Sequence, residues 1–259
     1  MRERGHESEQ VLRSWVRLFD ADPTLLGGID AAVARQLVRS TTVEMIEVPA
    51  STALPRRLSD ASVAGAMVVQ GVMAGTTWVG ERRSVELLGS GDIFALGAPT
   101  ASWTSLDRAR IAILDDDFVA SVQRFPTIVA LLMRRMSKRA DDLAQRLAIV
   151  SIRHLDDRLH ALLRHLAERW GQREGESVHI PLRLSHELLA DMACAQRPSV
   201  SVAAKELTRR GLVERGPRGT WILLPEPADA ASSAFAATTF ASAATVSRIT
   251  QPLALPSGH

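Results

Sequence analysis

The sequence predicts an α+β protein in which an N-terminal antiparallel β-barrel is followed by a long helix and a C-terminal winged helix-turn-helix. Three observations support this prediction. Short apolar runs separated by turn residues fill residues 41–118, helix-forming residues with an apolar seam occupy residues 119–152, and a helix, turn, helix and hairpin pattern follows over residues 153–225. The 259 residues are enough for two compact domains.

Residues 1–40 are predicted to form a helical lead-in to the barrel. The segment VLRSWVRLF at residues 11–19 places its apolar side chains at mixed helical spacing, and a second short helical pattern occupies residues 31–37. The first ten residues are rich in charged side chains and lack the apolar core of a signal peptide, so we expect a cytoplasmic protein.

The predicted barrel lies in residues 41–118. It contains apolar runs about as long as strands, namely AGAMVVQGVMAG, SVELLGSGDIF and ARIAIL. This pattern is typical of an antiparallel barrel or sandwich. The uncharged stretch at residues 61–80 contains four glycines, which favours hairpin strands over a membrane span. We therefore expect no membrane as a partner.

Charge is distributed unevenly, although the formal net charge is only +2. Residues 1–119 carry 12 Lys and Arg against 16 Asp and Glu, whereas residues 120–224 carry 18 against 11. A basic C-terminal half beside an acidic N-terminal half indicates that one part of the molecule meets a polyanion. The single cysteine, Cys194, excludes an intrachain disulfide, and we expect its thiol to be buried.

Residues 119–152 are predicted to form a long dimerisation helix. Apolar residues recur there at steps of three and four, and the predicted seam consists of Leu132, Met136, Ala140, Leu143, Leu147 and Val150. Such a seam packs against another helix, which a second copy of the chain would supply. The alternative is that the stripe packs on the chain's own domain. A second amphipathic helix is expected at residues 155–170.

Residues 182–224 have the pattern of a winged helix-turn-helix. Ser185 is a good N-cap for a short helix with one apolar side, and small residues after that helix form a tight turn. A second helix begins near Arg197, where Pro198 is tolerated, and Gly211 ends it. Two short strands with arginines at and beside their connecting turn follow as the wing.

This arrangement predicts contacts with double-stranded DNA. Arg197, Ser199 and Ser201 would face the bases, while Lys205 and the wing arginines would contact phosphates. For His186, phosphate contact and a plain surface position are both open. The full predicted set of DNA-binding residues comprises Ser185, His186, Gln196, Arg197, Ser199, Val200, Ser201, Lys205, Arg215 and Arg218.

With these motifs in view, residues 154–224 resemble the winged helix-turn-helix of the Crp/Fnr family of transcriptional regulators. SVELLGSGDIF at residues 84–94 resembles the Leu-x-x-Gly-x-Gly-Asp-x-Phe turn of that family's barrel. The resemblance implies a cyclic-nucleotide-binding-like jelly roll, a homodimer and a two-fold symmetric operator. It also implies RNA polymerase and a small-molecule effector as further candidate partners.

Two departures from the family pattern change the expected specificity. Members that read the best-known half-site carry Arg-Glu-x-Val-x-Arg, whereas residues 197–202 are RPSVSV. The missing glutamate and second arginine would each contribute about 1–3 kcal/mol of discrimination, so we expect a different operator. The Gly-Glu and Arg-Ser/Thr-Ala cassette that holds a cyclic nucleotide is also missing after Phe94. We therefore expect no control by cyclic AMP, and we assign no effector-binding residue.

No cofactor, metal site or enzymatic activity is expected. The predicted barrel contains no histidine, and the carboxylates at residues 115–117 are explained by the start of a helix. The alternative class is a barrel-based small-molecule-binding protein or enzyme in which the C-terminal module only mediates assembly. Residues 226–259, rich in Ala, Ser and Thr, are predicted to be a disordered tail.

Overall fold

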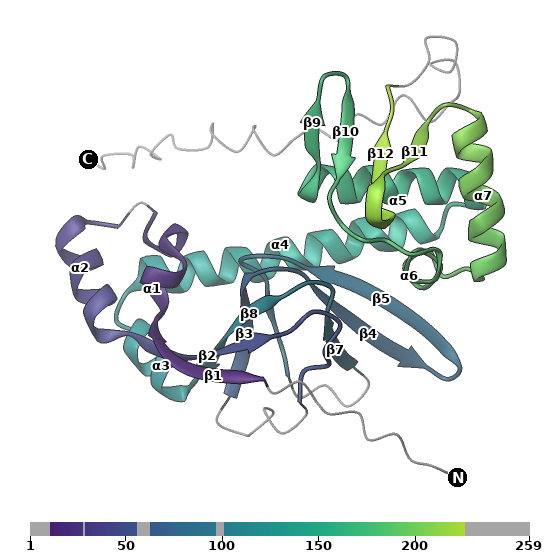
Figure 1. Ribbon diagram of the computed structural model, residues 1–259. Helices are drawn as coiled ribbons and strands as arrows, with labels where there is room; N and C mark the ends of the chain where they lie inside the picture. Colours follow the sequence, from purple (N-terminus) through teal and green to yellow (C-terminus); the bar gives the residue numbers. More distant parts are fainter. Residues whose placement is uncertain (1–10, 28, 56–62, 97–100, 226–259) are drawn as a thin grey trace, which may run out of the picture.

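Two antiparallel β-sheets form the N-terminal part of the protein (Figure 1). The computed structural model describes residues 11–27, 29–55, 63–96 and 101–225. The larger sheet has the order β1-β2-β8-β3-β6 and consists of β1 (Leu12–Arg17), β2 (Thr42–Val48), β8 (Ala109–Asp115), β3 (Val63–Gln70) and β6 (Ile93–Phe94). The smaller sheet has the order β5-β4-β7 and consists of β5 (Arg82–Leu88), β4 (Met73–Val79) and β7 (Ala101–Ser105).

Large apolar side chains from both sheets fill the space between them. The rings of Phe94 on β6 and Trp103 on β7 are both buried, with their centroids 4.3 Å apart. β4 passes close to Trp103 because Gly75 has no side chain, and a Cβ at this position would overlap the ring. The predicted α+β class is confirmed, but the N-terminal sheets form a jelly-roll-like sandwich rather than a closed barrel.

The first part of the predicted helical lead-in is wrong. Residues 12–17 form strand β1, which pairs with β2 from Leu12 opposite Glu47 to Arg17 opposite Thr42. The free edge of β2 supplies hydrogen-bond partners that a mixed apolar spacing cannot reveal. The second predicted helix is α2 (Ala31–Ser40), capped by the side chain of Asp30. α1 (Leu18–Ala21) and the 3-10 helix η1 (Pro23–Leu26) lie between β1 and α2.

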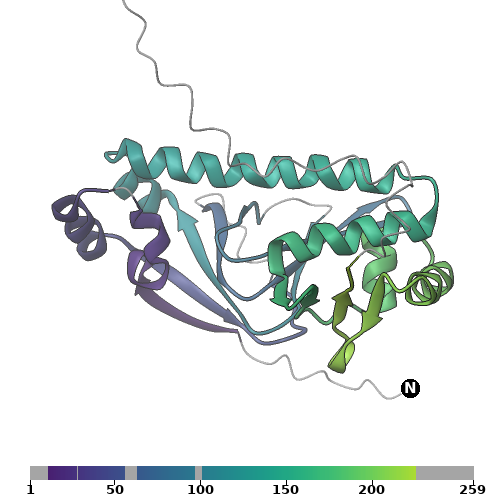
Figure 2. The same ribbon diagram turned by 90° about the horizontal axis from the view of Figure 1, so that it is seen from above.

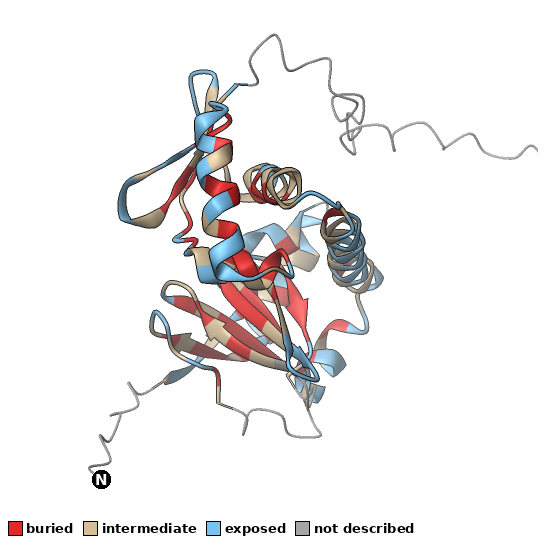
Figure 3. Ribbon diagram, turned by 90° about the vertical axis from the view of Figure 1, so that its right-hand side faces the viewer, coloured by how far each residue is buried: buried red, intermediate tan, exposed pale blue. Residues whose placement is uncertain are grey.

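The long helix is α4 (Pro126–Val150), which runs along one side of the molecule (Figure 2). A separate short helix, α3 (Asp116–Val122), precedes it, so the predicted helix at residues 119–152 is divided before Pro126. Ile128 and Ile149 are buried against the rest of the chain. Most of the opposite side of α4 is exposed, as the view along the helix shows (Figure 3).

The C-terminal part combines three helices with a second small sheet. The helices are α5 (Leu155–Trp170), α6 (His186–Met192) and α7 (Arg197–Arg209). The sheet has the order β11-β12-β10-β9 and consists of β11 (Val213–Arg215), β12 (Trp221–Leu223), β10 (Ser177–Ile180) and β9 (Gln172–Glu174), with the turn η3 (Pro217–Gly219) between β11 and β12. The hairpin of β9 and β10 was not predicted from the sequence.

Among the described residues, no helix is both long and apolar enough to cross a membrane. The predicted tail at residues 226–259 lies outside the described residues.

Candidate nucleic-acid interface

α6 and α7 form the predicted helix-turn-helix. The Oγ of Ser185 accepts a hydrogen bond from the backbone N–H of Leu188 at 3.1 Å, which makes Ser185 the N-cap of α6. On the inner sides of the two helices, Leu189 and Leu207 are fully buried in a common core. The geometry of α7 relative to α6 is therefore held by apolar packing as well as by the turn.

The turn between the two helices contains Cys194, whose φ of 51° lies in the left-handed region. This residue is exposed, so the expectation of a buried thiol is wrong. The left-handed turn reverses the chain so that the neighbouring Ala193 takes the fully buried position instead. The backbone N–H of Ala195 donates to the carbonyl oxygen of Ala190 at 2.9 Å and closes the turn.

The inner face of α7 corrects one predicted DNA contact. Val200 is 0% exposed and packs with Ala204 and Leu207 in the core, so it cannot reach a base edge. Three- and four-residue spacing places these residues on one side of the helix. The contribution of Val200 is to fix the orientation of α7, whose striped pattern of buried and exposed residues is visible in Figure 3.

The outer face of α7 carries three of the predicted contact residues, and a fourth lies at its N-cap. Arg197, Ser199 and Lys205 are exposed, and Gln196 is exposed at the N-cap of the helix. Val202, which was not among the predicted residues, is 68% exposed on the same face. The helical spacing of Ser199, Val202 and Lys205 was the available signal, since residues three apart share a face.

Ser201 is held by the preceding helix instead of being free to read DNA. Its Oγ lies 2.9 Å from Nδ1 of His186 and 3.1 Å from the carbonyl oxygen of Arg197, to which it donates. Burial lowers the pKa of His186, and the positive charges of Arg215 and Arg197 lower it further. His186 is therefore predominantly neutral at pH 7 and connects α6 to α7.

The wing is a short hairpin whose arginines have different surroundings. The Nη1 of Arg215 donates to the carbonyl oxygen of Leu184 at 3.1 Å, and its guanidinium lies 4.5 Å from the ring centroid of Trp221. Burial lowers the pKa of Arg215, which nevertheless stays protonated. Arg218 is exposed at the tip, with a φ of 55°. Arg215 thus orders the wing, and Arg218 presents its charge to solvent.

An open groove of about 770 Å³ lies between α6, α7 and the wing. It is lined by Ser185, His186, Glu187, Arg197, Ala204, Lys205, Thr208, Arg215 and Trp221. Three permanent cations face one carboxylate in this set, so the groove has the charge that attracts a phosphate backbone. Five of the predicted contact residues line this groove, namely Ser185, His186, Arg197, Lys205 and Arg215, whereas Arg218 lies at the wing tip.

The helix-turn-helix is docked on the smaller sheet. Arg83 of β5 forms ion pairs with Asp191 and, at 3.3 Å, with Glu187, both on α6. Its guanidinium also lies 5.9 Å from the ring centroid of Trp78 on the neighbouring strand. The hairpin formed by β4 and β5 therefore connects the N-terminal sandwich directly to the first helix of the candidate interface.

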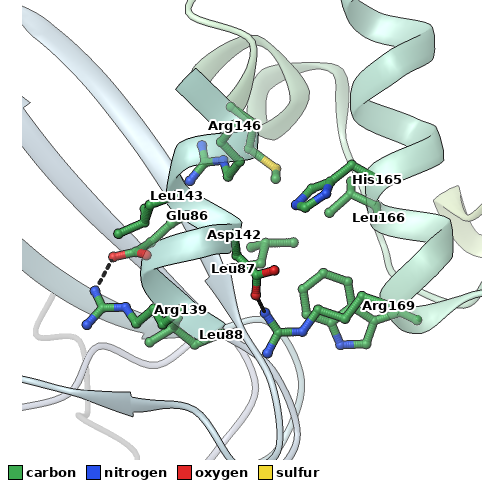
Figure 4. A pocket seen from close by; sticks show the side chains of 12 residues that line it. Glu86, Leu87, Leu88, Arg139, Asp142, Leu143, Arg146, His165, Leu166 and Arg169 are labelled. Atoms are coloured by element: carbon green, nitrogen blue, oxygen red, sulfur yellow. Dashed lines mark hydrogen bonds and ion pairs between the residues drawn. The ribbon is translucent and has the colours of Figure 1, made fainter. Parts of the chain in front are cut away.

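A small cavity behind this contact is crossed by ion pairs (Figure 4). Arg139 of α4 pairs with Glu86 at 2.7 Å, and Arg169 of α5 pairs with Asp142 at 3.1 Å. Arg169 also pairs with the buried Asp92 of the GSGD turn. Because these carboxylates are neutralised by guanidinium groups, the arrangement joins β5, α4 and α5 and does not resemble a pair of free catalytic acids.

Comparison with known proteins identifies the C-terminal module. Residues 157–228 match the model of the Crp-like helix-turn-helix domain. The chain is 27% identical over 129 residues to a CRP-like cAMP-activated global transcriptional regulator of Mycobacterium tuberculosis, covering 49% of this chain and 58% of that protein. It is also 27% identical over 147 residues to a cyclic AMP receptor protein of Thermus thermophilus, covering 53% of this chain and 64% of that protein. The matches span less than two thirds of either relative.

Solved structures share the fold over most of the chain. A mutant of CooA from Carboxydothermus hydrogenoformans superposes with a TM-score of 0.62 at 17% identity, covering 84% of this chain and 95% of that chain. The c-di-GMP responsive global regulator CLP of Xanthomonas campestris gives a TM-score of 0.58 at 17% identity, covering 76% of this chain and 100% of that chain. At these identities the likeness concerns the fold.

Fold and site together define a winged helix-turn-helix protein with an N-terminal jelly-roll-like sandwich and a long connecting helix. Within this class, residues 157–228 match the Crp-like helix-turn-helix domain, and about half of the chain is similar to a CRP-like transcriptional regulator.

Proposed function

We propose that this protein is a cytoplasmic, sequence-specific DNA-binding transcriptional regulator that binds a two-fold symmetric operator as a homodimer. The observation that carries the proposal is the exposed outer face of α7 beside a groove lined by Arg197, Lys205 and Arg215. A helix of this kind enters the major groove with its N-terminal residues toward the bases. The Crp-like domain match over residues 157–228 supports the same function.

The contact residues divide into two classes by chemistry. Arg197 and Ser199 lie exposed in the first turn of α7, where they would read base edges, with Gln196 beside them. Ser185, Lys205 and the wing arginines would contact phosphates, which position the protein without reading sequence. His186 supports this surface through its contact with Ser201.

Selection from randomised duplex DNA, followed by binding titrations at about 50 and about 200 mM salt, tests the proposal. We expect an enriched palindrome and an affinity that falls steeply with salt. Arg197→Ala should weaken binding to the selected operator by about 1–3 kcal/mol and flatten its base preference. The matched control is Arg209→Ala, because Arg209 lies in the last turn of the same helix and pairs with Glu206 at 2.6 Å.

Two results would contradict the proposal. One is the absence of any enriched sequence together with a salt-independent affinity. The other, directed at the assigned reading residue, is an Arg197→Ala protein that keeps both the affinity and the base preference of the wild type.

The outer side of α4 supports the homodimer. Met133, Met136 and Leu147 are 63%, 57% and 68% exposed, and Leu143 is also exposed. Their spacing follows the three- and four-residue steps of a coiled-coil seam. Leu132, which the predicted seam included, is partly buried against the chain's own core, and Met133 is the outward residue at this turn. A second copy of α4 would cover this apolar stripe.

Substitution within the stripe tests the dimer. Leu147→Glu places a charge within the expected contact, on the most exposed residue of the stripe, so we expect sedimentation to show a monomer with weak operator binding. Val79→Glu is the control, because Val79 is also an exposed apolar residue but lies at the end of β4. If Leu147→Glu and Val79→Glu form dimers of equal stability, the proposal that α4 forms the dimer interface is wrong.

We further propose that cyclic AMP does not control this regulator, because the sequence lacks the cassette that would hold its phosphate and ribose. Adding cyclic AMP should leave the operator affinity unchanged, and an increase in affinity would contradict the proposal. Contact with RNA polymerase and the existence of another effector stay predictions.

A further inference from the structure

Val202 occupies the middle of the surface that α7 presents for DNA. It lies one turn after Pro198 and Ser199 and one turn before Lys205, and all four residues are exposed. Residues three and four apart lie next to one another on a helix surface. The outer face therefore has an apolar centre, formed by Val202 and Pro198, with polar or charged side chains on either side.

Packing within the chain does not account for this valine. The core-facing side of α7 is occupied by Val200, Ala203, Ala204 and Leu207, which are all buried, whereas Val202 is 68% exposed. Valine is also a weaker helix former than alanine, because its branched side chain loses rotamer freedom in a helix. A single exposed valine is ordinary on a general surface, but this one lies where bases would be read.

The chemistry of Val202 and its neighbour Ser201 limits which feature of a base pair Val202 can recognise. The hydroxyl of Ser201 is engaged by His186 and the carbonyl oxygen of Arg197, so it does not extend the reading surface. Val202 itself carries two methyl groups and neither a donor nor an acceptor. In the major groove, the apolar feature that distinguishes one base pair from another is the C5-methyl group of thymine.

We propose that Val202 recognises the C5-methyl group of one thymine in each operator half-site. This inference rests on the proposed function, since it assigns the ligand of one residue on the same reading helix. The thymine would lie next to the base pair contacted by the Arg197 end of the helix, because both residues belong to its first two turns.

Uracil substitution tests this assignment at the level of one methyl group. Each thymine of the selected operator is replaced in turn by deoxyuridine, which removes the methyl group and leaves the Watson–Crick edge intact. We expect one position per half-site at which the wild-type affinity falls about fourfold, the value of one buried methyl-sized group. Replacement of the other thymines should have a smaller effect.

The variant Val202→Ala completes a double-mutant cycle. It should bind the thymine operator about fourfold more weakly for each half-site and should lose its sensitivity to uracil at the assigned position. Alanine favours the helix, so circular dichroism should show an intact fold. Ser199→Ala is the matched control, because it changes an adjacent exposed residue of the same face and should retain the uracil sensitivity.

The outcomes separate this inference from the proposed function. An enriched operator with wild-type binding that is insensitive to uracil at every position would overturn the role of Val202 alone. Equal uracil sensitivity in the wild type and in Val202→Ala would also overturn it. Failure to enrich any DNA sequence would instead contradict the proposed function, and with it this inference.

Discussion

At the scale of single residues, His165 links the stability of the fold to pH. It lines the cavity between β5, α4 and α5, where burial lowers its pKa below the ordinary value of 6.5. The positive charges of Arg146 and Arg169 lower the pKa further, while Asp142 and Glu168 partly oppose this shift. The folded chain therefore binds a proton at this position less readily than the unfolded chain does.

The sign of the pH effect follows from this difference. Well above pH 6.5 the histidine is neutral in both states, so its effect on the free energy of unfolding is constant. As the pH falls from 6.5 toward the lowered pKa, only the unfolded chain takes up the proton, and stability decreases. Urea unfolding at several pH values in this range should show that the free energy of unfolding decreases as the pH falls. The variant His165→Gln should show a smaller dependence of this free energy on pH.

The control for this measurement is His154→Gln, which changes an exposed histidine just before α5. If the free energy of unfolding depends on pH equally in the wild type and in His165→Gln, His165 is not the cause of the pH dependence.

Most exposed contact residues of α7 could be predicted from the sequence, whereas the role of a buried one was misassigned. Arg197, Ser199 and Lys205 could be predicted because the helical period separates their face from the apolar face. Val200 was misassigned because it was named from its place in a motif, although its spacing from Ala204 and Leu207 already placed it inward. The contact between His186 and Ser201 joins residues 15 positions apart and depends on the packing of α6 against α7.

At the scale of elements, the approach of β4 to β7 requires the absence of a side chain at Gly75. A Cβ there would overlap the buried ring of Trp103 in the core of the sandwich. Gly75→Ala should therefore force the ring or the strand to move and lower the free energy of unfolding by about 1–3 kcal/mol. Urea denaturation monitored by tryptophan fluorescence would measure the change in stability.

Gly27→Ala is the matched control for this prediction. Gly27 has a φ of −59°, and a Cβ there would meet only the carbonyl oxygen of Thr24 at an ordinary 3.4 Å. This variant should stay within about 0.5 kcal/mol of the wild type, as surface substitutions usually do. Equal losses in the two variants would mean that the contact with Trp103 is not the cause.

The types of the long elements could be predicted, whereas short elements and exact boundaries could not. α5 and α7 have a clear apolar face and good end signals, so their periodicity was sufficient. β1 was misassigned because its exposed, mixed pattern has no period, and pairing with β2 decides its conformation. The β9–β10 hairpin was missed for a similar reason, since β9 is exposed along its whole length and, among the described strands, pairs only with β10.

At the scale of the whole molecule, the two halves share one apolar core. Val85 and Leu87 of β5 and Val72 and Ala74 near β4 pack in the same cluster as the buried residues of α5, α6 and α7. The ion pairs of Arg83 with α6 lie at the edge of this contact. Arg83 is partly exposed, so Arg83→Ala should change the free energy of unfolding by only about 0–1 kcal/mol.

This shared core predicts that the sandwich and the helix-turn-helix unfold together. Leu87 and its neighbour Leu88 are both buried, but they point to opposite faces of β5. Leu87 packs in the core shared with the C-terminal helices, whereas Leu88 packs between the two sheets. Each truncation to alanine should therefore cost about 2–5 kcal/mol, but in different parts of the molecule.

Calorimetry can distinguish these two losses. The wild type should show one transition, and Leu88→Ala should shift it to lower temperature, because the core that connects the halves is unchanged. Leu87→Ala weakens that connection, so its transition should broaden or separate into two, as expected when two domains lose their cooperative contact. Identical single transitions in both variants would mean that the rest of the interface suffices to couple the halves. Two transitions already in the wild type would show that the packing of β5 against α6 does not make the molecule one cooperative unit.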